Sequence, residues 1–204
     1  MSAFFAAMRD GRLLTRERTR LWAVAMLAAS VLGLGFLLAT SDGLNDYQGR
    51  PLGTDFSNVY AAGTHVLEGN PAAAFDWPAQ HGRERQIFGD KTPFYGWHYP
   101  PYFLFVAGLL ALMPYALALA AWQAATLALY LGAVWLILRS SAPKRCALKP
   151  RALESPLWLL AALAFPAVFV NIGHGHNGFL TAALIGTALV CSTAGRWSPE
   201  SCSA

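Results

Sequence analysis

One carboxylate, Asp55, lies where it could do acid–base chemistry. It follows Gly53-Thr54 at the start of a segment, about residues 55–68, in which apolar side chains recur at three- and four-residue spacing. This spacing predicts a helix with one apolar face. A helix N-terminus favours a negative side chain, so Asp55 is either a capping residue or a general base that accepts a proton from an incoming hydroxyl. The sequence leaves both interpretations open.

A second polar group, His98-Tyr99-Pro100-Pro101, stands where a polar segment gives way to an apolar one. Paired prolines suit the first turn of a helix because they fix the backbone and lack an N–H. The run therefore predicts a helix start with an interfacial aromatic residue. His98 and Tyr99 are also hydrogen-bond donors that could contact a phosphate or a sugar.

A third polar group is the glycine-rich run 171–177, which carries His174, His176 and Asn177 between two apolar segments. Polar side chains at this depth are costly unless they face a cavity. Two histidines two positions apart could bind zinc, but no further ligand of fitting spacing is near. We therefore expect polar contacts to an anionic or hydroxylated substrate, and neither a metal nor a cofactor.

The composition is that of a membrane protein. Of 204 residues, 55% are apolar and only 13% are charged, which is too little polar surface to cover a soluble globule of this size. The net charge of +4 does not indicate a nucleic-acid partner, because Lys and Arg cluster beside apolar runs and so indicate topology. The three cysteines, Cys146, Cys191 and Cys202, show neither paired nor metal-ligand spacing.

The first membrane helix is predicted over residues 21–40, which carry no charge and have the length needed to cross the bilayer. It is too long for a signal peptide, so we interpret it as a retained span. The arginine-rich residues 1–20 predict a basic arm in the cytoplasm. The following loop, 41–98, has seven acids against four bases and is predicted to be extracytoplasmic.

The next apolar stretch, 99–138, contains no Lys, Arg, Asp or Glu and is too long for one span. Pro114 divides it into a short segment of about 102–113 and a full span of about 115–138. The basic loop 139–155 is predicted to lie in the cytoplasm, so the short segment is re-entrant or lies on the surface. The alternative is two crossings, with the basic loop outside.

Two further membrane helices are predicted at about 156–171 and 178–191. They return the chain outward and then inward, so the run 171–177 is expected on the same outer face as Asp55. The fold class is therefore an all-α integral membrane protein with about four membrane helices and a helical first extracytoplasmic loop. Residues 192–204 break the apolar pattern with Ser, Pro and Gly, and we interpret them as an atypical tail, consistent with a frameshift.

Taken together, these motifs resemble glycosyltransferase family 87, integral-membrane enzymes of the GT-C architecture. The resemblance covers about residues 50–190 and rests on the order of five short motifs: Thr54-Asp55-Phe56, Tyr60-Ala61-Ala62, Gly69-Asn70-Pro71, Tyr99-Pro100-Pro101 and Gly175-His176-Asn177. The family usually has Gly-Gln-x-Asn at the last of these, and His176 stands at the glutamine position. Family members are about twice as long as this chain, so the resemblance concerns an N-terminal portion.

The resemblance implies transfer of a hexose, often mannose, from a polyprenyl-phosphate carrier to a hydroxyl of a glycan or lipid acceptor. The reaction would take place on the outer face of a bacterial-type plasma membrane. It implies that Asp55 is the catalytic base and that no metal is required. In such a reaction the basic or donor groups Arg83, Arg85 and His98 could stabilise the departing phosphate. Two other classes stay open: a non-catalytic membrane remnant or assembly partner, and a small transporter. A transporter is disfavoured because the predicted spans carry no ionisable residue.

Overall fold

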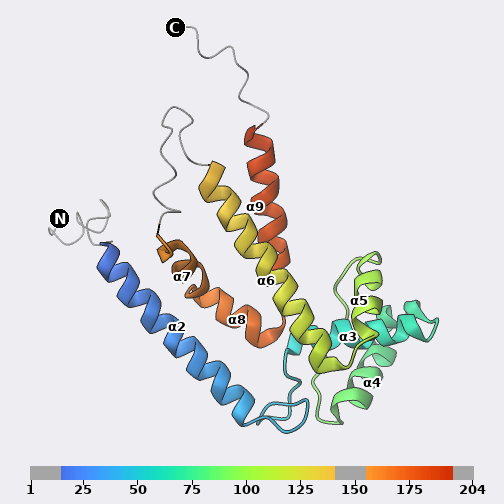
Figure 1. Cartoon of the computed structure of the whole chain (residues 1–204). Helices are drawn as coiled ribbons and strands as arrows, with labels where there is room; N and C mark the ends of the chain where they lie inside the picture. Colours follow the sequence, from blue (N-terminus) through green and yellow to red (C-terminus); the bar gives the residue numbers. More distant parts are fainter. Residues whose placement is uncertain (1–14, 141–154, 195–204) are drawn as a thin grey trace, which may run out of the picture.

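The computed structural model describes residues 15–140 and 155–194, and in these ranges helices alternate with irregular connections and no strand is present. The prediction of an all-α fold is confirmed. The predicted basic arm up to residue 14, the loop 141–154 and the tail from 195 lie outside the described residues. The elements, labelled as in Figure 1, are α2 (Arg16–Ala39), α3 (Thr54–Leu67), η1 (Pro71–Phe75), α4 (Trp77–Phe88), α5 (Phe103–Ala111), α6 (Tyr115–Ser140), α7 (Leu157–Leu163), α8 (Pro166–His174) and α9 (Gly178–Ala194).

Two helices, α2 with 24 residues and α6 with 26, are long and apolar enough to cross a membrane. The pair α7 and α8 counts as a third crossing if it is taken as one bent span. The apolar helix α9 has 17 residues, fewer than the roughly 20 that a straight crossing needs. Within residues 15–140 and 155–194 the structure thus supports two or three spans by length and composition, whereas the sequence predicted about four.

The helix predicted over 156–171 is two helices in the structure. They meet at an angle of 49°, with α7 ending at Leu163 and α8 beginning at Pro166. Proline has no N–H to donate and its ring clashes with the preceding turn, which explains the break. The second helix then continues to His174, so only Gly175, His176 and Asn177 form the turn that the sequence predicted over the whole run 171–177.

A compact lobe forms between α2 and α6. Its central helix, α3, packs against α5, η1 and α4. Two of these elements, η1 and α4, are not predicted from the sequence, which indicated only turns there. The lobe core also includes residues from the first two turns of α6. The buried apolar residues of this core are Phe56, Val59, Ala62, Ala74, Phe88, Trp97, Phe103, Leu104, Ala107, Leu110, Tyr115, Ala118 and Trp122.

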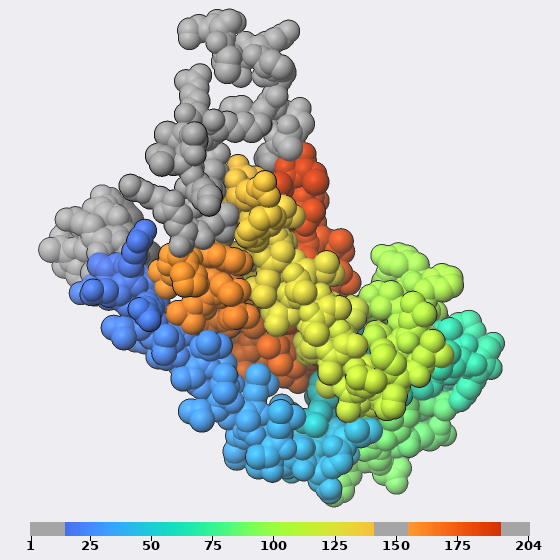
Figure 2. All heavy atoms as spheres, viewed as in Figure 1, coloured from blue at the N-terminus to red at the C-terminus, as the bar shows by residue number. Residues whose placement is uncertain are grey.

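The long helices run away from this lobe in one direction (Figure 1). The end of α2, the start of α6, the end of α8 and the start of α9 lie on the lobe side, whereas their other ends lie on the far side. Helix α9 packs along α6. Figure 2 shows α2, in blue, along one side of the molecule, with the lobe in cyan and green at its lower end. The turn after α8 therefore lies beside the start of α3.

Candidate functional site

Asp55 is the second residue of α3, and its carboxylate is not the helix cap. The N-cap position is Gly53, whose φ of 72° is left-handed. The Asp55 side chain is 36% exposed, and Nε2 of His176 lies 3.7 Å from its Oδ2. A pair at this distance is not hydrogen bonded. The carboxylate is thus left available to a third group, as a general base requires.

The turn between α8 and α9 lies against the start of α3 because Gly175 permits a close approach. A Cβ at Gly175 would lie 2.6 Å from the Cβ of Phe56, and the residue's φ of 66° is in the left-handed region that disfavours other residues. Asn171, which is buried, closes the turn from inside. With its amide nitrogen facing the His176 carbonyl, it donates to that oxygen at 2.9 Å and accepts from the N–H of Phe179 at 3.2 Å.

The orientation of His176 follows from its own hydrogen bond. Its Nδ1 accepts from the N–H of Gly178 at 3.0 Å, so in the neutral imidazole the proton is on Nε2. That N–H is the one on the side of Asp55. His176 therefore presents a donor next to the carboxylate, in the position where the family pattern has a glutamine amide.

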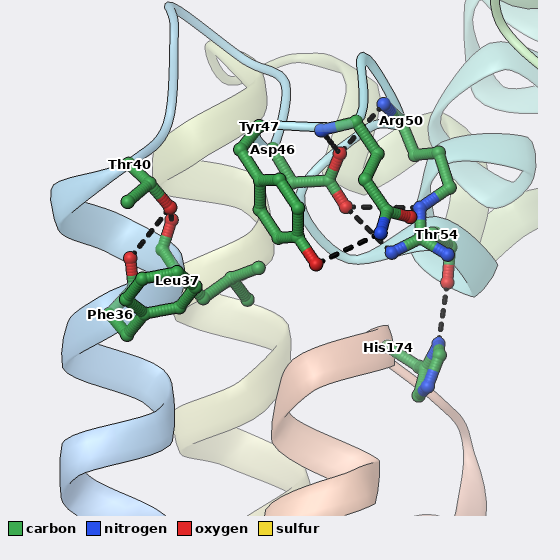
Figure 3. A network of polar contacts seen from close by, with 9 residues as sticks. Phe36, Leu37, Thr40, Asp46, Tyr47, Arg50, Thr54 and His174 are labelled. Carbon is green, nitrogen blue, oxygen red and sulfur yellow. Dashed lines mark hydrogen bonds and ion pairs between the residues drawn. The ribbon is translucent and has the colours of Figure 1, made fainter.

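His174, one residue before the turn, contacts the residue before Asp55. Its Nδ1 lies 2.7 Å from Oγ1 of Thr54, a contact visible in Figure 3. The end of α8 is also held by α6, since Gln123 donates from Nε2 to the carbonyl of Ile172 at 2.8 Å. These bonds join α3, α6 and α8 around Asp55. Helices that are remote in sequence thus position the same carboxylate.

Asp55 opens into a recess of about 520 Å³, called here the Asp55 recess. Five of the residues that the sequence predicted for the site line it: Asp55, His98, Tyr99, His176 and Asn177. Asn58, Tyr95 and Pro100 complete the lining. Asn58 lies three residues after Asp55 and so shares its helix face, a signal that could have identified it. No sequence pattern marks Tyr95 as a member of the site.

The two tyrosines of the recess remain protonated donors. Burial raises the pKa of the Tyr99 phenol, and the nearby Asp55 carboxylate raises it further. Burial likewise raises the pKa of Tyr95. His98 donates from Nε2 to the carbonyl of Tyr95 at 2.9 Å, because a carbonyl can only accept. Its Nδ1 is then the acceptor of the neutral ring. The recess accordingly offers one carboxylate among several hydrogen-bonding groups.

Two predicted residues, Arg83 and Arg85, do not line the Asp55 recess. Both are in α4, and each is paired with a carboxylate. Arg83 bonds to Glu68, and Arg85 bonds to Asp90 at 3.1 Å, with the side chains 46% and 91% exposed. The structure therefore gives both guanidinium groups partners outside the recess.

A second hollow, of about 330 Å³, lies on the other side of Asp55 and shares His176 with the recess. It also shares Val170 and His174 with a third hollow of about 260 Å³, called here the α2–α8 hollow. The apolar wall of the α2–α8 hollow comes from α2 and α8, and its polar rim includes Arg50, Thr54 and His174. The three hollows are therefore neighbours, from the α2–α8 interface to the Asp55 recess.

Arg50 on this rim is held by Asp46 (Figure 3). Its Nε and Nη2 donate to Oδ2 of Asp46 at 3.0 and 2.9 Å, and Oδ1 of Asp46 accepts from two backbone N–H groups. Burial raises the pKa of Asp46, but these hydrogen bonds outweigh burial and hold the pKa below its ordinary value. Arg50 stays 45% exposed and keeps further N–H donors for a ligand.

Within the described part of the chain, no group of three or more His, Cys, Asp or Glu residues is placed to hold a metal ion. The recess itself offers the carboxylate of Asp55 and the hydrogen-bonding groups that surround it. A family model, described as glycosyltransferase family 87, matches residues 97–202. No curated protein and no solved structure matches the chain significantly.

Proposed function

Because the chain belongs to glycosyltransferase family 87, we propose that it transfers a hexose such as mannose from a polyprenyl-phosphate carrier to an acceptor hydroxyl. Asp55 takes the proton of that hydroxyl, and the oxygen attacks the anomeric carbon of the donor sugar. The bond between that carbon and the phosphate oxygen breaks, and the polyprenyl phosphate leaves. The observation that carries this proposal is the available carboxylate of Asp55 at the meeting point of two hollows.

The Asp55 recess is the place that we assign to the sugar and the acceptor. Sugar hydroxyls pair with donors and acceptors, and the recess supplies both from His98, Tyr99 and Asn177. His176 presents its N–H beside the carboxylate and would orient it toward the acceptor. The matched residues 97–202 include this histidine but begin after Asp55, so the role of Asp55 rests on its position and on the motif around it.

The α2–α8 hollow is the place that we assign to the phosphate end of the donor. Its wall is apolar, as a prenyl chain requires, and Arg50 and His174 stand on its rim. A guanidinium binds phosphate through its fork of N–H groups, and it would stabilise the negative charge that builds up on the leaving group. Arg50 thus replaces Arg83 and Arg85 as the basic group of the proposal.

The proposed orientation places the lobe outside the cytoplasm of a bacterial-type cell, with the chain anchored in the plasma membrane by several spans. The arginines at the start of α2 and the basic residues after α6 favour the inside for the far ends of these helices. The donor would then reach the α2–α8 hollow sideways from the outer leaflet. On such a route the polyprenyl chain of the carrier would stay in the bilayer while the donor binds.

The test is a transfer assay with the full chain in lipid nanodiscs. Radiolabelled polyprenyl-phosphate mannose serves as donor, and a bacterial envelope lipid extract serves as the source of acceptor. Removing a general base lowers rates by about 10²–10⁴-fold, so Asp55→Asn is expected to reduce label transfer by that factor. The matched control is Asp90→Asn, which alters a 91% exposed carboxylate of the same lobe and is expected to keep the rate.

Two outcomes would contradict the proposal. Transfer that survives in Asp55→Asn would remove Asp55 as the base. No transfer by the unaltered chain, under conditions where the donor binds, would favour a non-catalytic partner of an assembly. Donor binding is measured separately, by native mass spectrometry of the nanodisc-released chain with the same polyprenyl-phosphate mannose. Arg50→Gln is expected to weaken that binding, whereas Arg85→Gln is expected to leave it unchanged.

A further inference from the structure

Two polar side chains on α4 are entirely enclosed by the lobe. Gln80 and Glu84 have no exposed surface, and they lie one helical turn apart on the same face. Burying an amide or a carboxyl is unfavourable unless hydrogen bonds replace those made with water. Neither side chain belongs to the Asp55 recess, so their burial calls for a role that the proposed reaction does not use.

Each side chain holds a different wall of the Asp55 recess. Gln80 donates from Nε2 to the backbone carbonyl of Asn58 at 3.0 Å, and Asn58 lines the recess from α3. Glu84 accepts at Oε2 from the backbone N–H of Tyr95 at 3.3 Å. Tyr95 lines the recess from the extended segment before α5. Helix α4 therefore contacts both walls from behind.

The contact of Glu84 continues to a residue of the site. The carbonyl of Tyr95 accepts from Nε2 of His98 at 2.9 Å. The backbone of Tyr95 is therefore bonded to Glu84 through its N–H and to His98 through its carbonyl. Gly96, with a φ of 65°, turns the backbone between them. A shift of the Tyr95 amide would therefore move the histidine that faces the recess.

The second oxygen of each side chain takes no part in these two contacts. Oε1 of Gln80 and Oε1 of Glu84 are buried and make no hydrogen bond to the described residues. Burial raises the pKa of Glu84, although the Tyr95 N–H, His81, the Gly96 N–H and Gln80 act in the opposite direction.

We propose that Gln80 and Glu84 are positioning residues that set the width of the Asp55 recess, Gln80 through Asn58 and Glu84 through Tyr95 and His98. This inference rests on the proposed function in one respect only, namely that the recess holds the sugar and the acceptor. The positioning itself depends on the hydrogen bonds given above. It therefore predicts a structural effect that does not need the transfer reaction to occur.

The first experiment is hydrogen exchange of the full chain in nanodiscs. Glu84→Leu removes the acceptor of the Tyr95 N–H, and amides of residues 94–99 are expected to exchange about tenfold faster, the effect of losing one hydrogen bond. Glu84→Gln keeps an oxygen that can accept from the Tyr95 N–H, so exchange is expected to stay at the wild-type rate. Gln80→Leu is expected to accelerate exchange in α3 around Asn58 instead. Amides of α6 beyond Trp122 serve as the internal reference.

The outcomes separate the inference from the proposed function. Equal exchange rates in Glu84→Leu and the unaltered chain would overturn the positioning role. Exchange that is as fast in Glu84→Gln as in Glu84→Leu would overturn it as well. If Glu84→Leu unfolds the whole lobe, the shorter carboxyl of Glu84→Asp supplies the same comparison. In the transfer assay, Glu84→Leu is expected to raise the KM for the donor sugar at least tenfold, and Glu84→Gln to restore it. Faster exchange with an unchanged KM would keep the positioning role and overturn the recess as the sugar site.

Discussion

Helices α2 and α3 differ in how they contact the rest of the molecule. Helix α2 has 24 residues and buries one of them, Ala23, whereas α3 has 14 residues and buries eight. From Leu21 onward α2 carries no charged side chain, and its apolar residues include exposed Leu32 at 74% and Phe36 at 60%. The buried residues of α3 include the polar Ser57, Asn58 and His65.

The comparison teaches that the two helices are stabilised by different surroundings. In α2 the apolar residues need a hydrocarbon solvent, because so few of them are covered by protein. In α3 the residues are covered by α4, α5, η1 and α6, so packing and hydrogen bonds hold each side chain in place. The carboxylate that we propose as the base is on the helix that the protein itself positions. Matched substitutions in the two helices can test this difference.

The largest effect is expected for the two phenylalanines. Phe56 is fully buried at the centre of the lobe core, so Phe56→Ala is expected to cost about 3–5 kcal/mol of unfolding free energy. Phe36→Ala, on α2, removes a side chain that is 60% exposed and is expected to change the free energy by less than about 1 kcal/mol. Denaturant unfolding in detergent measures both. Equal costs at the two positions would mean that α2 is packed as closely as α3.

The next effect is expected for two helical glycines. A Cβ at Gly63 would lie 2.2 Å from the carbonyl oxygen of Ala107, so Gly63→Ala must push α3 and α5 apart. We expect a loss of about 1–3 kcal/mol, the range for overpacked cores. At Gly35 in α2 a Cβ would meet nothing within 4 Å, and Gly35→Ala is expected to raise the thermal midpoint slightly, because alanine favours helix. A lower midpoint for Gly35→Ala would indicate a close neighbour of α2.

A smaller effect is expected for the hydroxyl of Tyr115. This buried side chain, at the start of α6, donates to the carbonyl of Leu52, directly before the turn that leads to Asp55. Tyr115→Phe keeps the ring but removes the hydroxyl that donates to this carbonyl, and the expected cost is about 1 kcal/mol of unfolding free energy. Tyr47→Phe is the control, because Tyr47 is 58% exposed. Thermal unfolding measures both, and equal midpoints would show that the Leu52 bond contributes nothing.

The smallest effect is expected for the pH dependence of the loop between α2 and α3. The pKa of Asp46 is lower in the folded chain than its ordinary value of 3.8. Its contribution to stability is therefore fully present above that ordinary value and is lost as the pH falls through the lowered value. Unfolding midpoints between pH 6 and pH 2, a span of about four units chosen to bracket this carboxyl, are expected to fall less steeply in Asp46→Asn. Parallel curves for the two proteins would contradict a stabilising role of the Asp46–Arg50 pair.

Much of the fold could be predicted from local sequence patterns. The charge-free run after the arginines indicated α2, and the three- and four-residue spacing after Gly53 indicated α3. The break before Pro166 is also a local effect, although the sequence was interpreted as one continuous helix. Helix α4 was not predicted because its apolar residues do not repeat on one face. Its position depends on Gln80 and Glu84 reaching partners in other elements.

The site could be predicted only in part. Asp55, His98, Tyr99, His176 and Asn177 were predicted as site residues, and the structure brings them to one recess. The roles of these residues stay a prediction. Arg83 and Arg85 were included because they are basic, yet their helix directs them to Glu68 and Asp90. Charge alone does not give the direction of a side chain when the helix that carries it is unknown.

By itself, the sequence determined that the chain is helical, rich in membrane-type segments and similar to a glycosyltransferase family, because periodicity, hydropathy and short motifs are local properties. It also placed Asp55 at a helix start. Only the tertiary structure decided that Gly53 is the cap, that His176 faces the carboxylate, and that Asn58 and Tyr95 line the same recess. Those facts depend on contacts between residues up to about 120 positions apart, such as Thr54 with His174. Such contacts form only when packed helices bring distant segments together.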